Sequence, residues 1–117
     1  MRDTLQKIID STPGAKSAIL MGFDGITVEH VYAEGVDEDA ESMAMEFSFR
    51  FVELRNAAES LEMGSLSDIT LKAEYGTLLV HCLNSEYFLA LFLADAKSFG
   101  KGRWMLRSSA SSLIAEL

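Results

Sequence analysis

The stretch Asp39–Met63 reads DAESMAMEFSFRFVELRNAAESLEM, and it decides how the rest of the chain is arranged. Its apolar residues recur at steps of three and four, as on a helix that covers one core. They are Ala40, Ala44, Phe47, Phe51, Leu54, Ala58 and Leu61. A second apolar line, Met45, Phe49 and Val52, lies about a quarter-turn away, since each helical residue advances by roughly 100°. Because one small domain offers a helix only one core, the second line predicts a surface that meets another chain.

The elements around this helix are shorter, and turn signals separate them. Pro13 ends an opening helix, and Asp24-Gly25 is a strong hairpin signal. Gly64 is a plausible end for the long helix. We expect, in chain order, a helix over 2–11, strands over 17–23 and 26–33, the long helix, strands over 68–75, 77–83 and 87–94, and a helix over 101–117.

The polarity of the strands predicts their order in one sheet. The strands over 17–23, 77–83 and 87–94 are apolar at nearly every position, as strands covered on both faces are. The strands over 26–33 and 68–75 alternate, so we place them at the edges. Joining the hairpins gives the order second, first, fifth, fourth, third. The predicted fold class is α/β, a mostly antiparallel five-stranded sheet with helices on both faces, in a single domain over residues 1–117.

This order leaves the third strand with an open row of backbone donors and acceptors, which a protein must protect or use. Lys72 is a candidate guard residue. Pairing with the same strand of a second copy would instead extend the sheet across a two-fold axis. The second line of the long helix would then meet its own mate. The predicted dimer interface is Met45, Phe49, Val52, Asn56, Asp68, Thr70 and Lys72.

The net charge of −8 is concentrated in the first part of the chain. Residues 1–64 carry thirteen acidic and five basic side chains, whereas residues 65–117 carry five of each. This negative charge argues against nucleic acid as a partner, because it would repel the phosphates. The acids at 37–41 suit a helix amino terminus, where the dipole favours negative charge, and a basic partner is the alternative.

The sequence also indicates the compartment. The single Cys82 excludes an internal disulfide framework. We find no secretory signal and no apolar stretch near the ~20 residues of a membrane span. We therefore expect a cytoplasmic protein with no membrane insertion.

No catalytic, metal or cofactor constellation is visible. His81 and Cys82 are adjacent on a strand, so their side chains point to opposite faces. His30 lies on an edge strand, where a solvated or locally bonded histidine is expected. Gly100-Lys101-Gly102 lacks the arrangement of a phosphate-binding loop. We predict a protein that is not an enzyme and carries no metal or cofactor.

Several features together carry a family resemblance across essentially all 117 residues. They are the opening helix with its strand and Asp24-Gly25 hairpin, the Ala-, Met- and Phe-rich long helix, and the segment GKGRWMLR at Gly100–Arg107. In these the chain resembles the roadblock/dynein light-chain family. The resemblance implies a roadblock/profilin-like fold and a dimer, with itself or with a related chain, through the second helix and third strand. It also implies a platform for small Ras-like GTPases or an adaptor in motor and membrane-signalling complexes.

Bacterial members of the family resemble the regulator of gliding polarity, which promotes GTP hydrolysis without an inserted arginine. We therefore expect a dimeric scaffold that docks a small Ras-like GTPase, any stimulation of hydrolysis arising from positioning of its switch segments. The predicted partner-binding residues are Glu46, Arg50 and Glu53. Glu46 and Glu53 flank Arg50 at helical spacing, and Glu59 follows Arg55 by four, so local ion pairs are expected in preference to an arginine finger. The alternatives are a nucleotide-insensitive motor or signalling adaptor and a small-molecule sensor, which would need a pocket.

Overall fold

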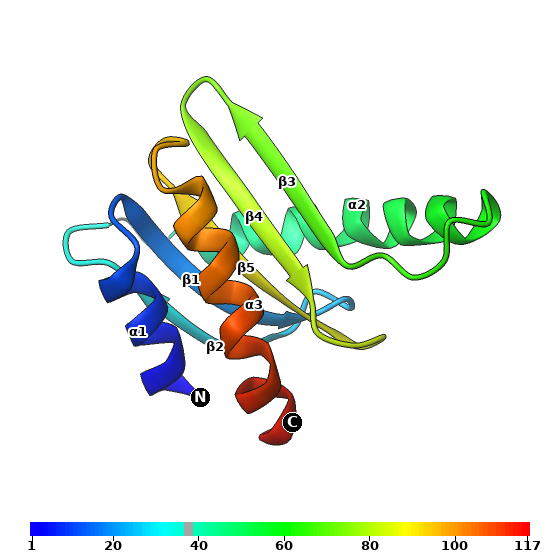
Figure 1. Cartoon of the computed structure of the whole chain (residues 1–117), viewed down its shortest axis with the longest axis horizontal. Helices are drawn as coiled ribbons and strands as arrows, with labels where there is room; N and C mark the ends of the chain where they lie inside the picture. Colours follow the sequence, from blue (N-terminus) through cyan, green and yellow to red (C-terminus); the bar gives the residue numbers. More distant parts are fainter. Residues whose placement is uncertain (37–38) are drawn as a thin grey trace.

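The computed structural model describes residues 1–36 and 39–117, so the acids Asp37 and Glu38 lie outside the described residues. The elements follow the expected order of helix, two strands, helix, three strands and helix (Figure 1). They are α1 (Arg2–Ser11), β1 (Ala15–Gly22), β2 (Thr27–Tyr32), α2 (Ala40–Ser60), β3 (Asp68–Ala73), β4 (Gly76–Cys82), β5 (Tyr87–Leu93) and α3 (Phe99–Ala115).

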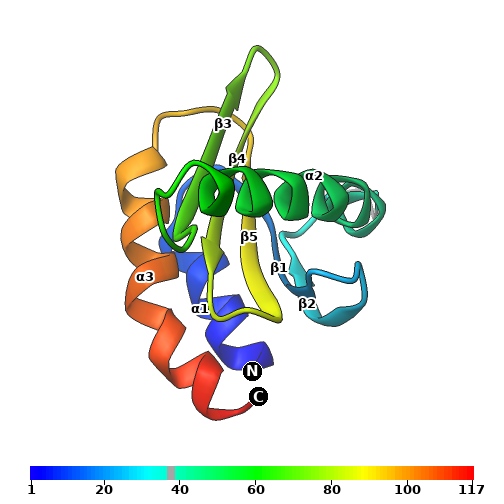
Figure 2. The same ribbon diagram turned by 90° about the vertical axis from the view of Figure 1, so that its right-hand side faces the viewer.

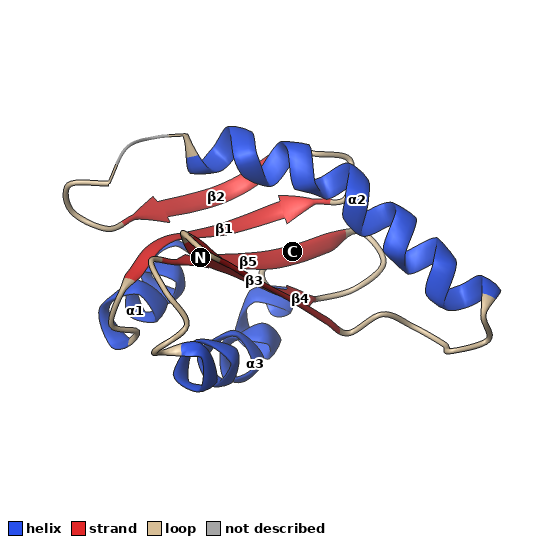
Figure 3. Cartoon of the chain, turned by 90° about the horizontal axis from the view of Figure 1, so that it is seen from above, coloured by secondary structure: helices blue, strands red, loops and turns tan. Residues whose placement is uncertain are grey.

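The strands form one sheet in the order β2-β1-β5-β4-β3, and every neighbouring pair is antiparallel. The predicted strand order and α/β class are therefore confirmed. Helices α1 and α3 cover one face of the sheet, and α2 covers the other (Figure 3). As predicted, β2 and β3 are the edges, because each pairs with one neighbour among the described residues.

The central strands are buried on both faces, which explains their continuous apolar sequence. In β1, Ala18 and Leu20 belong to the core beneath α1 and α3, whereas Ile19 and Met21 belong to the core beneath α2. All four side chains are fully buried. Alternate residues of a strand point to opposite faces, so one apolar run serves both cores.

Helix α2 extends beyond the sheet that it covers. Figure 2 shows it crossing the strands, and Figure 1 shows its carboxyl-terminal half projecting past β3. Ala40, Ala44 and Phe51 are buried, but Leu54 is 48% and Leu61 71% exposed. The prediction that the whole first stripe lies on the core is wrong for these two leucines. A helix of 21 residues is about 31 Å long, whereas five strands span about 19 Å between the outer two.

The ends of the long helix also differ from prediction. It begins at Ala40 and stops at Ser60, and Glu62, not Gly64, is the first residue with positive φ after it, at 59°. Glu62 takes the left-handed conformation that usually favours glycine at a helix end, and the Met63 N–H returns to the Ala58 carbonyl at 2.9 Å. Among the described residues, no helix combines the length and apolarity needed to cross a membrane.

Candidate interaction surface

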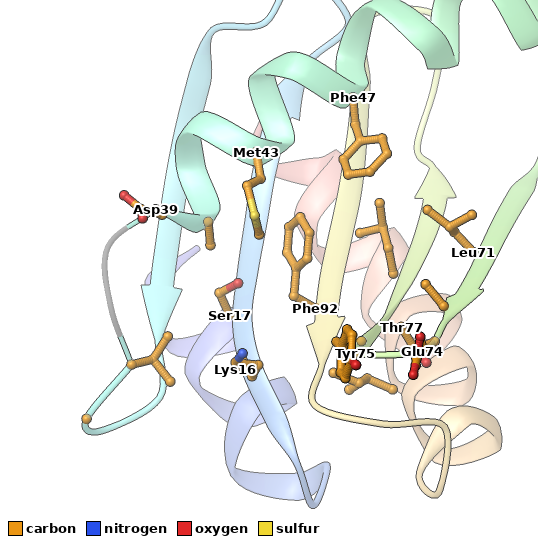
Figure 4. Close-up of a pocket in the computed structure, with 17 residues that line it drawn as sticks. Lys16, Ser17, Asp39, Met43, Phe47, Leu71, Glu74, Tyr75, Thr77 and Phe92 are labelled. Atoms are coloured by element: carbon orange, nitrogen blue, oxygen red, sulfur yellow. The ribbon is translucent and has the colours of Figure 1, made fainter.

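An apolar groove of about 750 Å³ opens between the first half of α2 and the β3–β4 hairpin (Figure 4). Helix α2 contributes Met43 and Phe47 to its wall, and the sheet contributes Leu71, Leu78 and Phe92. Polar side chains stand at its rim, and they are Lys16, Asp39, Glu74 and Tyr75. The sequence did not predict this groove.

The alternation of β3 explains why the groove is apolar. Ile69 packs against the core beneath α2, so Leu71 and Ala73 point to the same side of the sheet. Leu71 is 43% exposed, because none of the residues that the structure describes covers it fully. The groove therefore presents an uncovered strip of sheet beside an open edge strand.

The polar residues predicted for the dimer interface on β3 point to the other side. Asp68 Oδ1 lies 2.9 Å from His81 Nδ1. The Lys72 ammonium lies 3.9 Å from the ring centroid of Phe99 at the start of α3. Thr70 is exposed between them. These three residues therefore belong to the α3 side of the edge, and only their backbone is shared with the groove side.

The second apolar line of α2 does not share the groove either. A side chain added at Gly25, in the β1–β2 hairpin, would lie 3.2 Å from Met45 Cγ, so Met45 faces the hairpin end of the sheet. Met45 is 45% and Phe49 55% exposed, while Val52 is partly buried against the core beneath α2. Exposed Asn56 continues this line. Helix α2 thus has two flanks that face opposite ends of the sheet. The groove flank carries Met43 and Phe47, and the Met45 flank faces the β1–β2 hairpin.

The outward face of α2 carries the predicted partner-binding residues. Glu46, Arg50 and Glu53 are all exposed, and helical spacing places Phe49 beside them. Arg50 Nη1 lies 2.9 Å from Glu53 Oε1, the local ion pair that was expected. The result is a polar helix face with one aromatic side chain in it.

Arg55 does not make the pair with Glu59 that was predicted. Its guanidinium lies 4.4 Å from the centroid of the Phe23 ring and donates to the Ser85 carbonyl at 2.8 Å. The aromatic face and the carbonyl supply a partly buried site for the cation, whereas Glu59 is exposed on the projecting end of the helix. Arg55 therefore ties α2 to the β4–β5 hairpin.

The described residues contain no cluster of three or more metal-binding side chains. His81 contacts Asp68, and Cys82 packs against the core beneath α2, on the opposite face as predicted. His30 Nδ1 lies 3.7 Å from Glu41 Oε2, and its ring lies 4.9 Å from that of Tyr32. These contacts connect elements of the fold, and none of them assembles a nucleophile with a base.

We expect Cys82 to react slowly with iodoacetamide in the folded protein. Burial, aided by the charge of Asp68 and opposed by Arg55, raises the pKa of the thiol from 9.0 to about 11. Because the thiolate is the nucleophile, alkylation near pH 8 should be roughly 100-fold slower than in the urea-unfolded chain. Folding favours the protonated thiol, so its contribution to stability is complete below pH 9.0 and is lost as pH rises through about 11. Mass spectrometry of the alkylated protein measures both rates, and equal rates would contradict the prediction.

Comparison with known proteins supplies the family context. No protein-family model matches the chain, and no curated protein matches it. Among solved structures, MglC from Myxococcus xanthus is 33% identical, with a TM-score of 0.71 over 98% of this chain and 97% of that chain. A Roadblock/LC7 domain from Streptomyces avermitilis is 18% identical, with a TM-score of 0.86 over 99% of this chain and 96% of that chain. The gliding protein MglB from Thermus thermophilus is 18% identical, with a TM-score of 0.83 over 95% of this chain and 83% of that chain.

Proposed function

Because the chain belongs to the roadblock/LC7 family, we propose that it acts as a dimeric scaffold that docks a small Ras-like GTPase on its paired α2 helices. The proposal treats residues 1–117 as a single, non-enzymatic domain. The observation that best supports the proposal is the apolar groove beside β3, the edge of the sheet past which α2 projects. The cytoplasm is the proposed location, since the free thiol of Cys82 suits a reducing compartment.

A dimer with one two-fold axis would cover the apolar groove and also give the projecting half of α2 a surface to pack on. Pairing β3 with its copy would fill the open backbone edge and place the two sheets side by side. The projecting half of each α2 would then lie over the partner's groove. Its exposed Leu54 and Leu61 would cover Leu71 and Met43 of the other copy, all of which are more than 40% exposed in one chain. This arrangement assigns the groove flank of α2, not the Met45 flank, to the partner helix.

The outward face of the paired helices is the proposed docking platform. Phe49 offers an aromatic anchor, the kind of residue that dominates binding energy at interfaces. Glu46, Arg50 and Glu53 surround it with charges that fix orientation. Arg50 is engaged by Glu53, so we expect any stimulation of hydrolysis to come from holding the switch segments and not from an inserted arginine.

A calorimetric titration distinguishes this function from its alternatives. A Ras-like GTPase from the same genome would be loaded with GDP or with a non-hydrolysable GTP analogue and titrated with the scaffold. Tighter binding of the GTP form supports the proposal. Equal binding of both forms would favour a nucleotide-insensitive adaptor. A small-molecule sensor predicts instead that neither form of the GTPase binds.

We expect Phe49→Ala to weaken GTPase binding at least tenfold without changing the oligomeric state. The side chain is 55% exposed, so its loss removes a contact surface and little of the core. Calorimetry measures the affinity, and light scattering measures the mass. Ile114→Ala is the matched control, because Ile114 is an apolar side chain, 41% exposed, on α3 across the sheet. An unchanged affinity in Phe49→Ala would remove this face from the proposal.

A further inference from the structure

The one tryptophan of the chain, Trp104, is 61% exposed on α3. Helix α3 lies across the sheet from α2 (Figure 3), so this residue belongs to the opposite face of the sheet from the apolar groove and the proposed docking surface. Its indole is the largest side chain of this helix, and most of it lies in water. Exposed tryptophans are characteristic of interfaces, where the ring supplies a large and rigid contact.

Two hollows flank Trp104. One, of about 550 Å³, is lined by Gly100, Arg103, Trp104, Arg107 and Ser108, which lie at helical steps of three and four. The other, of about 560 Å³, runs between α3 and α1. The side chains from Ser108 to Ser112 are all small, so the surface of α3 beyond Trp104 is low beside the indole ring. The ring therefore stands as a ridge between two depressions.

The surroundings of the ridge are basic, in contrast to the net charge of −8 for the whole chain. Lys7, Lys101, Arg103 and Arg107 line the two hollows, and among the described residues none of them pairs with a carboxylate. Of the described residues, Asp3 is the one acid that lines either hollow.

Arg103 contacts the ring of Phe99, one turn earlier on α3. Its Nε is buried and has no hydrogen-bond acceptor in the described part of the chain, and its guanidinium lies 5.5 Å from the Phe99 ring centroid. The Lys101 ammonium lies 5.3 Å from the Trp104 ring centroid. The aromatic faces hold both cations beside Trp104, where a carboxylate from a partner could pair with them.

We propose that the Trp104 ridge binds an acidic peptide segment of a partner protein, its carboxylates pairing with Arg103, Arg107 and Lys101 and an apolar side chain lying against the indole. Charge complementarity argues for this occupant. Nucleic acid is a poorer fit, because its phosphates would extend beyond the basic residues to the acidic remainder of the chain, whereas a short peptide stays on the basic patch. A lipid surface is a poorer fit, since one large apolar side chain projects here between two hollows and an interfacial helix needs a broad apolar face. The inference does not depend on dimer formation or GTPase docking.

The fluorescence of Trp104 reports binding directly, because no other tryptophan contributes. The probes are synthetic peptides of about twelve residues in which Glu alternates with Leu or Phe, and the same peptides with Gln replacing Glu. We expect a saturable shift of the emission with the Glu peptides. Affinity should fall at least tenfold for the Gln peptides, and also when NaCl is raised from about 0.05 M to about 0.5 M.

Arg107→Glu should weaken the Glu peptides at least tenfold. Arg2→Glu carries the same change of net charge on an exposed residue of α1 that lines neither hollow and should bind them normally. Equal binding of the Glu and Gln peptides, or no saturable shift with any peptide, would overturn the proposal. A blue shift with phosphatidylserine vesicles alone would assign the ridge to membranes and overturn it too.

Discussion

Leu71→Glu is expected to convert the proposed dimer into a folded monomer, raising its dissociation constant at least about 1,000-fold. In one chain Leu71 is 43% exposed and lines the apolar groove, so the partner helix would complete its burial. Two-fold symmetry places the substitution at the interface twice. Each lost leucine costs about 2 kcal/mol, and each introduced carboxylate must be desolvated without a partner. The folded monomer should survive because a glutamate at this position reaches water when the groove is empty.

The matched control is Val28→Glu. Val28 is 39% exposed and lies on β2, the opposite edge of the sheet. Its substitution adds the same charge to a strand that the proposed dimer does not use, so the mass should remain that of the wild type. Light scattering after size exclusion, over a series of protein concentrations, gives both dissociation constants. A wild-type monomer, or a Leu71→Glu dimer, would contradict the proposed interface, and the groove would then await a different chain.

The strand order could be predicted from the sequence because the polarity of a strand's residues shows how many of its faces are buried. A strand covered on both faces must be apolar throughout, as Ala18–Met21 is, and an edge strand covered on one face alternates, as β3 does. Three hairpin turns and the polarity of five strands then left one economical order. The edges and both cores followed from the same information.

The environment of each α2 residue could not be predicted in the same way. Helical periodicity defines which side of a helix is apolar, but it does not say where the sheet beneath it ends, so Leu54 and Leu61 appeared to belong to the core. Nor does it orient the helix on the sheet. Met45 and Phe47 both lie beside the buried stripe, yet one faces the β1–β2 hairpin and the other faces the groove. Only the crossing of α2 over the strands separates them.

The exposed Trp104 marks another limit. The apolar run Trp104-Met105-Leu106 makes all three side chains candidates for burial on sequence alone, and Met105 and Leu106 are indeed buried. A single helical step carries a side chain by about 100°, enough to move it from the core to solvent. Because Gly102 and Met105 face the sheet, Trp104 is directed outward.

Phe88→Ala is expected to remove about 3–5 kcal/mol of unfolding free energy. Phe88 is fully buried on the central strand β5. Its ring lies 5.2 Å from that of Phe23 and 5.1 Å from that of Phe51 in an edge-to-face contact. Phe51 is the aromatic residue by which α2 reaches the sheet, so the cavity would open beneath the helix. Since a domain of this size has about 5–15 kcal/mol in total, the variant should retain its fold with a melting temperature lower by about 10–20 °C.

Dimer formation would add stability that depends on protein concentration. The effect of Phe88→Ala on the unfolding free energy should therefore be measured in the monomeric Leu71→Glu variant. Urea titration there gives the free energy, and Phe49→Ala supplies a matched control, since its ring is 55% exposed and should cost less than about 1 kcal/mol. Hydrogen exchange adds a local readout. Because the cavity faces α2, the amides of that helix should lose protection before those of β1, which the core beneath α1 and α3 still supports. A uniform loss across both elements would mean that the two cores unfold as one unit, and a loss below about 1.5 kcal/mol would mean that α2 settles into the space left by the ring.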